Sequence, residues 1–388
     1  MKNYNALTML TGFMAALPDV ARIVMTSGIK RGFRTQIETF TSGIQNNITK
    51  ISKAEAQRFG EAIDMITGQR AMLFSDIGDM FGIHNKVEAG LSKLANINFM
   101  YVNLMSRWTE FVKGAAALTI STRIIEDCKL WRAGKLGDKW KTKLAASGID
   151  EDMARRIANE ADNHATKTQY NYLPNTAKWS DTAAEQAFGG ALNKDINITI
   201  VTPTKGDTPL WMSTEVGSTI AQFKKFTMGA TQRMLLRGMQ EKDMDFLFGS
   251  ILLLGSGLMI DGLYQTHRFN KDYSKIPLNE KLLAAFDRSG LGGVYVDINR
   301  AIESLTDNRI GIRPMLGARK PYGTDLKNKV STLLGPSSGQ IVNMFNIAYD
   351  VGTNKYNHYT ARNVRRLIPF QNVWYLDWLF DDIEKGLR

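Results

Sequence analysis

Residues 246–260 have the sequence FLFGSILLLGSGLMI, and of all the apolar runs in the chain this one comes closest to a membrane span. Asp243 and Asp245 precede the run and Asp261 follows it. A helix of this length, at about 1.5 Å per residue, extends roughly 22 Å, less than the ~30 Å hydrocarbon layer of a bilayer.

Two interpretations of the apolar run remain open. It is either a fully buried core helix or a segment that meets a bilayer or a neighbouring subunit once copies of the chain assemble, where Gly249, Gly255 and Gly257 would permit close helix contact. In the second case ten residues are candidates for membrane or subunit contact: Phe246, Leu247, Phe248, Ile251, Leu252, Leu253, Leu254, Leu258, Met259 and Ile260.

The sequence on both sides of this run predicts mostly helix. The long apolar stretch 94–125 favours a helix that is buried on several sides, and Asp150 is placed to cap a helix that begins at Glu151. The β-prone run 196–201 indicates one strand. We therefore expect a mainly α fold, an elongated multi-helix bundle with minor strand and loop connectors.

Prolines and turn residues suggest how the chain is divided. The region 170–209 is richer in proline and turn residues than the helical sequence on either side, with Pro174, Pro203 and Pro209. It separates two helical parts. We expect four regions: an N-terminal helical domain (1–170), an irregular connector (171–213), a central helical hairpin with the apolar segment (214–308), and a basic C-terminal region ending in an aromatic docking helix (309–388).

Composition excludes several classes of protein. The chain has 388 residues, 44% of them hydrophobic, which is enough for a sizeable core. Its single cysteine, Cys128, rules out an intrachain disulfide, and its four histidines are at least 80 residues apart, which argues against a local zinc site. No phosphate-binding loop, nucleophile elbow or HExxH motif is present. We expect no catalytic residues, no metal and no cofactor; a cryptic peptidoglycan hydrolase is the enzymatic alternative.

Basic charge is concentrated near the C-terminus. The whole chain carries +11, and residues 309–371 contain ten Lys or Arg against two acids, a net of +8. Such a surface suits a phosphate backbone or anionic lipid headgroups, although a solvated face without a partner has the same composition. The candidate phosphate contacts are Arg313, Arg319, Lys320, Lys327, Lys329, Arg362, Arg365 and Arg366.

Several short motifs, in order along the chain, resemble one family. They are LPDVAR (17–22), WTEFVK (108–113), LAASGI (144–149), VTP (201–203) with GDTP (206–209), QFKKF (222–226), DRSG (287–290) and RRLIPFQNVWYL (365–376). Together they resemble the C-terminal region of the internal virion, or DNA-ejection, proteins of short-tailed phages, a module also found in large phage polyvalent proteins. Members are often far longer, so we expect either a processed piece of such a protein or a stand-alone version.

The resemblance implies a role in genome delivery. Such a protein is packed in the capsid core, passes through the portal, and oligomerises with other ejection proteins into a conduit for genomic DNA across the host periplasm and inner membrane. The transglycosylase domain of some relatives has no counterpart here. A purely structural capsid-core protein around the portal and a general DNA-binding protein are the alternatives. The last motif is expected to dock onto the chain's own core or a partner through Pro369, Asn372, Trp374, Tyr375 and Trp378.

Overall fold

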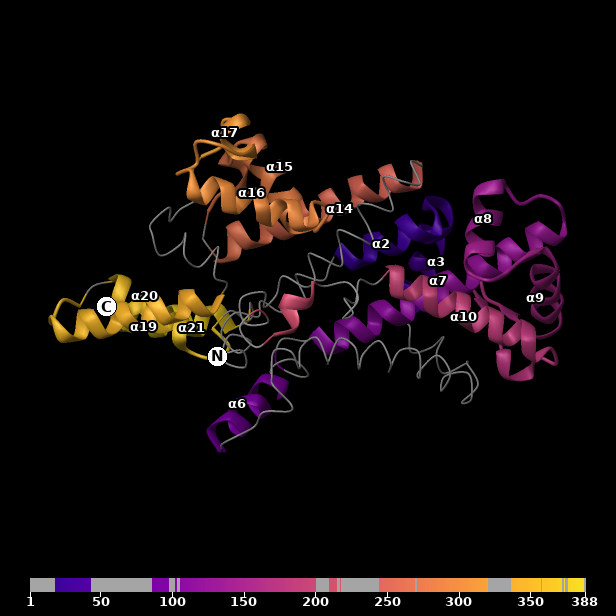
Figure 1. The fold of residues 1–388 in the computed structure, drawn as a ribbon, viewed down its shortest axis with the longest axis horizontal. Coiled ribbons are helices and arrows are strands. Elements are labelled where there is room, and N and C mark those ends of the chain that lie inside the picture. Colours follow the sequence, from indigo (N-terminus) through magenta and orange to yellow (C-terminus); the bar gives the residue numbers. More distant parts are fainter. Residues whose placement is uncertain are drawn as a thin grey trace.

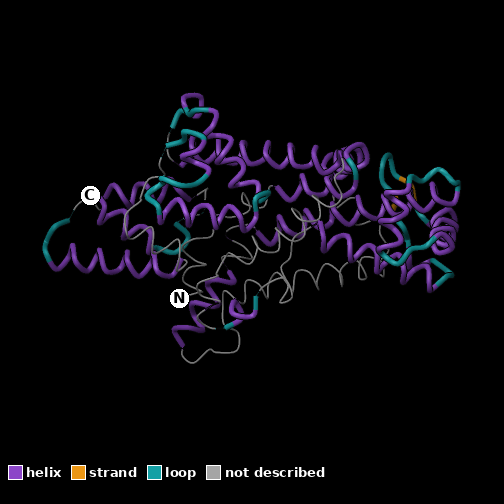
Figure 2. The backbone as a smooth tube through the Cα atoms, turned by 45° about the horizontal axis from the view of Figure 1, so that its top comes forward, coloured by secondary structure: helices purple, strands orange, loops and turns teal. Residues whose placement is uncertain are grey.

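The structure is a computed structural model, and it confirms the expected mainly α class. It describes residues 18–42, 86–97, 102, 105–199, 209–214, 217, 244–268, 271–319, 336–356, 358–371, 373 and 376–386. Helices dominate these residues, and a short hairpin is the only sheet among them (Figure 2). Figures 1 and 2 show an elongated molecule, with α9 near one end and α19 and α20 near the other.

The N-terminal unit is built around helix α7 (Met105–Arg132), whose residues 112–125 are all buried. This confirms the expected burial for 112–125, whereas it is wrong at the start of the stretch, where Leu94 and Ile97 belong to another helix, α6, and are exposed. The elements packed around α7 are α2 (Pro18–Ser27), α3 (Ile29–Ser42), α8 (Asp138–Ala146), α9 (Glu151–His164), α10 (Thr182–Thr199) and strand β2 (Tyr172–Leu173). Helix α6 (Lys86–Ile97) lies between α3 and α7 in the sequence but is set apart from this group in Figure 1.

Helix α7 buries charges as well as apolar side chains. Arg123 is 2% exposed and forms an ion pair with Asp195 of α10, and its Nε lies 3.9 Å from Asp127 on the next turn. Asp127 in turn pairs with Arg31 of α3. Burial raises the pKa of Asp127 despite the two nearby guanidinium groups. This ionic network therefore fixes three helices to one another, because any member left unpaired would be a buried charge.

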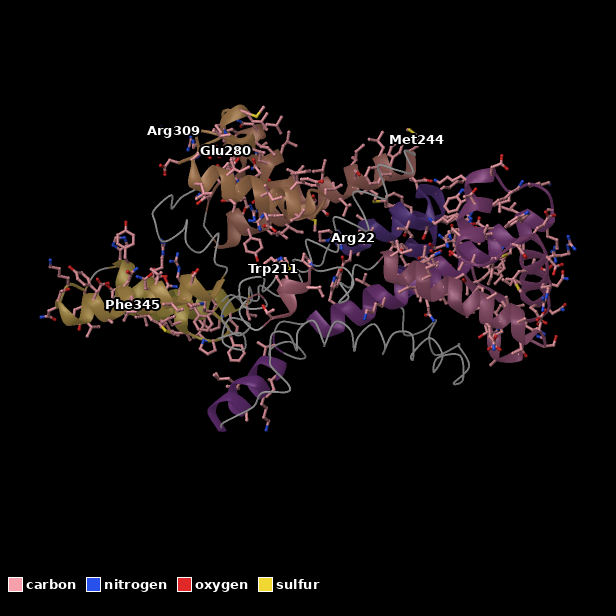
Figure 3. The ribbon with its side chains drawn as sticks, viewed as in Figure 1. Arg22, Trp211, Met244, Glu280, Arg309 and Phe345 are labelled. Atoms are coloured by element: carbon pink, nitrogen blue, oxygen red, sulfur yellow. The ribbon has the colours of Figure 1, made fainter. Side chains whose placement is uncertain are left out.

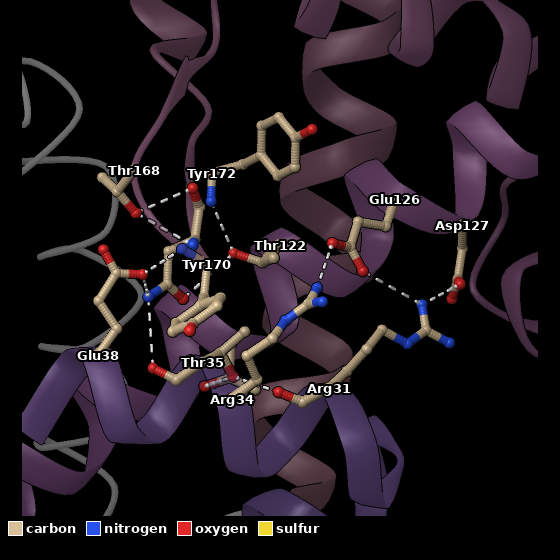
Figure 4. Close-up of polar contacts among 12 residues, drawn as sticks. Arg31, Arg34, Thr35, Glu38, Thr122, Glu126, Asp127, Thr168, Tyr170 and Tyr172 are labelled. Atoms are coloured by element: carbon tan, nitrogen blue, oxygen red, sulfur yellow. Dashed lines mark hydrogen bonds and ion pairs between the residues drawn. The ribbon is translucent and has the colours of Figure 1, made fainter.

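A carboxylate of α3 holds the hairpin of β1 (Thr166–Lys167) and β2 (Figure 4). Glu38 accepts hydrogen bonds from the backbone N–H groups of Gln169 at 3.1 Å and Tyr170 at 2.7 Å, and from Asn171 Nδ2 at 2.8 Å. Burial alone would raise the pKa of Glu38, but these bonds and one from Thr168 hold it below its usual range. The turn is thus tied to α3 by one side chain.

The expected cap at Asp150 is confirmed, because its side chain accepts a hydrogen bond from Met153 N at 2.8 Å. The strand expected at 196–201 is wrong for its described residues: α10 stays helical to Thr199. Ile196 is fully buried and Asp195 pairs with Arg123, so tertiary packing overrides the β propensity of the segment. The irregular connector was predicted at 171–213. This prediction is wrong over α10, which is a regular helix and belongs to the N-terminal core.

Helices α14 to α17 form a second unit. Helix α14 (Met244–Leu263), continued by a π-helical turn (Tyr264–Arg268), packs along α15 (Leu278–Ser289), and α16 (Gly293–Leu305) and α17 (Ile312–Met315) follow. Helix α2 also packs on α14, where Ala21 and Met25 contact the small core around Leu253 and Leu291. The expected boundary at 308/309 therefore does not separate packed units, because α17 lies with α15 and α16 (Figure 1).

The C-terminal unit consists of α19 (Pro336–Gly352), α20 (His358–Leu367) and α21 (Asp377–Gly386). Helix α20 packs against both α19 and α21. Its last helix, α21, carries Trp378 and lies where the aromatic helix was expected.

Candidate contact surface on helix α14

Helix α14 is longer than its apolar run. It is continuous over 20 residues, which corresponds to about 30 Å. Including the π-helical turn, residues Met244–Thr266 are long and apolar enough to cross a membrane, and only 28% of the most apolar window is buried. The first of the two interpretations, a fully buried core helix, does not describe this element.

The two faces of α14 differ sharply in exposure. Ile251 is 55% exposed, whereas Leu253, two residues on, is completely buried. Of the ten predicted contact residues, Leu247, Phe248, Ile251 and Met259 are exposed, and Phe246, Leu252, Leu254 and Leu258 are half-buried. Leu253 and Ile260 are buried inside the protein, so their assignment to an external contact is wrong for this structure. We call Met244, Leu247, Phe248, Ile251 and Met259 the α14 face (Met244 is labelled in Figure 3).

The glycines of α14 serve contacts within the chain. A Cβ at Gly249 would lie 2.4 Å from Met25 Cβ on α2, and one at Gly257 would lie 2.2 Å from the carbonyl oxygen of Ala285 on α15. A Cβ at Gly255 would meet nothing within 4 Å. Close contact between copies was expected at all three glycines, but Gly249 and Gly257 are already occupied by α2 and α15.

Each end of α14 carries an aspartate that is paired with another element. Asp245 lies 2.7 Å from Lys139 Nζ of α8. Asp261 accepts a hydrogen bond from Arg288 Nε of α15 at 3.0 Å, and its side chain is 2% exposed. The sequence showed these aspartates as boundaries of the apolar run. The helix includes both positions, and both carboxylates are paired.

The predicted phosphate contacts fall into two separate groups. Arg313 lies beside α15 and α16, where it pairs with Asp287 at 3.2 Å and Glu303 at 3.5 Å. Arg319 follows α17 and is 84% exposed, with its Nε 3.6 Å from Glu280. The other described candidates belong to α20, in the C-terminal unit. The structure does not assemble them into one surface with Arg313 (Figure 1).

On α20 only part of the predicted basic face is exposed. Arg362 and Arg366 are exposed, but Arg365 is 12% exposed and pairs with Asp381 and with Glu384 of α21. Arg365 therefore holds α21 against α20, and the prediction that it contacts phosphate is wrong for this structure. Lys320, Lys327 and Lys329 lie outside the described residues.

The predicted docking motif is only partly described. Pro369 is half-buried and Trp378 is 66% exposed, while Asn372, Trp374 and Tyr375 lie outside the described residues. A neighbouring apolar stripe on α19 was not predicted. It consists of Ile341, Met344, Phe345 and Tyr349, all of which are exposed. Their successive spacings of three, one and four residues place them on one side of a helix, and this is the signal that would have identified the stripe. Phe345 is labelled in Figure 3.

Within the described ranges, no three His, Cys, Asp or Glu side chains are placed to hold a metal ion. Comparison of the chain with protein-family models, curated proteins and solved structures finds no match.

Proposed function

We propose that this chain is a phage internal virion protein of the DNA-ejection type, which oligomerises and helps to form the conduit for genome delivery across the host envelope. The observation that carries the proposal is the α14 face, an apolar surface on a helix long enough to cross a bilayer. Contiguous exposed apolar surface of this kind is typical of protein or membrane interaction sites. The motifs that resemble ejection proteins give this contact its biological setting.

The geometry favours a lateral contact. Among the described residues, α2 and α15 cover one side of α14, which leaves the side that carries Phe248 and Ile251 open to a neighbouring copy or a bilayer. Burying a side chain of this size contributes roughly 1.5–3 kcal/mol. Several such side chains therefore supply a substantial driving force for association with another copy or with the host inner membrane.

The exposed arginines of α20 supply the contact with DNA in this proposal. Arg362 and Arg366 are four residues apart and share one side of the helix. Contacts of this type bind phosphates without sequence preference and weaken with salt. Other ejection or core proteins and the portal are the proposed protein partners, first in the virion interior and later in the host periplasm and inner membrane. The proposal contains no catalytic step.

A purely structural capsid-core protein around the portal is the second candidate. It is favoured by the satisfied ends of α14, because Asp245 and Asp261 are both paired in the folded chain. In such a protein the α14 face would contact another core protein and never a membrane.

Release of an encapsulated dye from phospholipid vesicles separates the two candidates. Wild type should release the dye, and Ile251→Asp should not, because it places a charge on the exposed face without disturbing the core. Arg155→Gln, on the exposed surface of α9, lowers the net charge by the same one unit and is the control for a charge change elsewhere. Equal release by wild type and Ile251→Asp, or no release by wild type, would contradict the conduit proposal.

A further inference from the structure

A charged cleft of about 870 Å³ lies beside the C-terminal end of α14. Its walls come from the end of α14, the segment 271–277, α15, α16 and the region of α17. Six basic side chains line it: Lys271, Lys275, Arg288, Arg300, Arg313 and Arg319. The proposed conduit function does not use this cleft.

The basic side chains outnumber the acids around them. Four carboxylates line the cleft, and a fifth, Glu303, lies behind Arg313 at 3.5 Å, so the group keeps one positive charge in excess. Asp287 is shared, since its Oδ2 lies 3.0 Å from Arg300 and 3.2 Å from Arg313. Lys275, Arg300 and Arg319 are exposed at the rim. A single excess charge with arginines at the rim suits a monoanionic phosphodiester.

Gln265 adds an unused hydrogen-bond acceptor to the cleft wall. Its Oε1 is buried and has no hydrogen-bond partner, while its Nε2 lies 3.5 Å from Asp261. A buried acceptor left unpaired is costly, so a ligand that donates a hydrogen bond here would be stabilised. A hydroxyl group next to the phosphodiester would satisfy this oxygen.

The cleft continues from the apolar flank of α14. Leu254, Leu258, Asp261 and Gln265 are spaced by four, three and four residues, which places them along one side of the helix. Both leucines are half-buried, Leu254 partly against the small core around Leu253, and the two polar residues line the cleft. An apolar row therefore leads directly into a cationic cleft, the arrangement that an amphiphile with an anionic head requires.

We propose that this cleft binds the headgroup of an anionic phospholipid with a hydroxylated head, such as phosphatidylglycerol. Lys275, Arg300 and Arg319 contact the phosphodiester, Gln265 accepts a hydrogen bond from a headgroup hydroxyl, and an acyl chain lies along Leu254 and Leu258. The inference rests on the membrane contact proposed for α14 and names the lipid class that this contact would select.

The test is flotation with phosphatidylcholine vesicles and with equimolar phosphatidylcholine and phosphatidylglycerol vesicles. Lys275→Gln/Arg300→Gln/Arg319→Gln is compared with a control of equal charge change on other exposed surfaces, Arg155→Gln/Lys178→Gln/Lys385→Gln. We expect the cleft variant to bind the anionic vesicles at least about tenfold more weakly than the control variant. Equal loss in the two variants would overturn the proposal, because it would indicate non-specific attraction.

Two further arms define the ligand. Gln265→Leu should weaken binding to phosphatidylglycerol vesicles but leave binding to phosphatidic acid vesicles unchanged, since phosphatidic acid lacks the headgroup hydroxyls. Inorganic phosphate should not displace the protein from anionic vesicles at matched ionic strength; displacement would identify a free-phosphate site and overturn the lipid assignment.

If the cleft variant matches wild type while wild type still binds phosphatidylcholine vesicles, this inference fails and the α14 proposal stands. If wild type binds neither vesicle, both fail.

Discussion

Asp245 of α14 and Lys139 of α8 form an ion pair of 2.7 Å that joins the apolar helix to the N-terminal unit. The other carboxylate oxygen of Asp245 accepts a hydrogen bond at 3.2 Å from the backbone N–H of Ile29, the first residue of α3. Between α2 and α3 the chain turns at Gly28 with φ +87°, and a Cβ there would lie 3.4 Å from Trp140. One carboxylate thus ties the start of α14 to two helices of the N-terminal unit.

Replacing Asp245 should loosen this connection. We expect Asp245→Ala to lower the free energy of unfolding by about 1–2 kcal/mol, since it removes both the ion pair and the hydrogen bond at the start of α3. Lys139→Gln removes the half-exposed ion pair and the contact of Lys139 Nζ with the Trp140 ring but keeps the Ile29 hydrogen bond, and it should cost less than about 1 kcal/mol. Urea unfolding measures both variants, and an equal cost would show that the Ile29 hydrogen bond contributes nothing.

Two glycines of α14 should respond in opposite ways to alanine. Gly257→Ala places a methyl group against the backbone of Ala285 and should destabilise the protein by about 2 kcal/mol, because α14 and α15 must move apart. Gly255→Ala meets open space and should stabilise it by up to about 1 kcal/mol through helix propensity. Chemical denaturation of the two variants side by side gives the comparison. A similar change in both would mean that α15 does not pack closely on α14.

The stability contributed by Asp181 should depend on pH. Two hydrogen bonds from Arg156, both at 2.6 Å, and one from Ala184 N lower the pKa of Asp181 to about 2. A lowered pKa in the folded state stabilises the fold above the unfolded pKa of about 3.9, and this contribution disappears as the pH falls toward 2. Asp181→Ala should therefore cost about 2 kcal/mol at neutral pH. Unfolding measured at several pH values should show the gap from wild type closing between pH 4 and pH 2; a constant gap would contradict this account.

Cys128 should be unreactive in the folded chain. It is fully buried on α7, and burial raises the pKa of its thiol, with Asp127 adding to the shift. Because the thiolate is the reactive form, a thiol reagent should label native protein far more slowly than unfolded protein. As the single cysteine, it reports on the N-terminal unit alone. Rapid labelling on addition of vesicles would show that this unit opens there, contrary to the lateral contact proposed for intact α14.

Local sequence patterns predicted the elements that depend on local forces. The burial of 112–125 follows from an apolar stretch, and the cap at Asp150 follows from a side chain placed before an acidic first turn. The segment 196–199 was misjudged because its β-prone residues fill a helical position beside Arg123. Its structure depends on packing against the core and on the neighbouring Asp195, whose partner Arg123 lies 72 residues away in sequence.

The contact surface was predicted in kind but not in detail. Hydrophobic content identified α14, yet it could not separate exposed Ile251 from buried Leu253, because almost every position of the helix is apolar. Nor does charge along the sequence show that Arg365 is held by Asp381, or that Asp261 is neutralised by Arg288. These pairings depend on how the helices pack, which periodicity does not specify.

The central claim, that the α14 face is a contact surface, is tested most directly by the mass of the purified protein. Light scattering coupled to size exclusion should be measured for wild type and Ile251→Asp, with and without phospholipid vesicles. We expect wild type to form a discrete oligomer that also associates with vesicles, and Ile251→Asp to remain a folded monomer in both conditions. The claim would be contradicted if wild type is a monomer that does not associate with vesicles, or if Ile251→Asp forms the same oligomer as wild type.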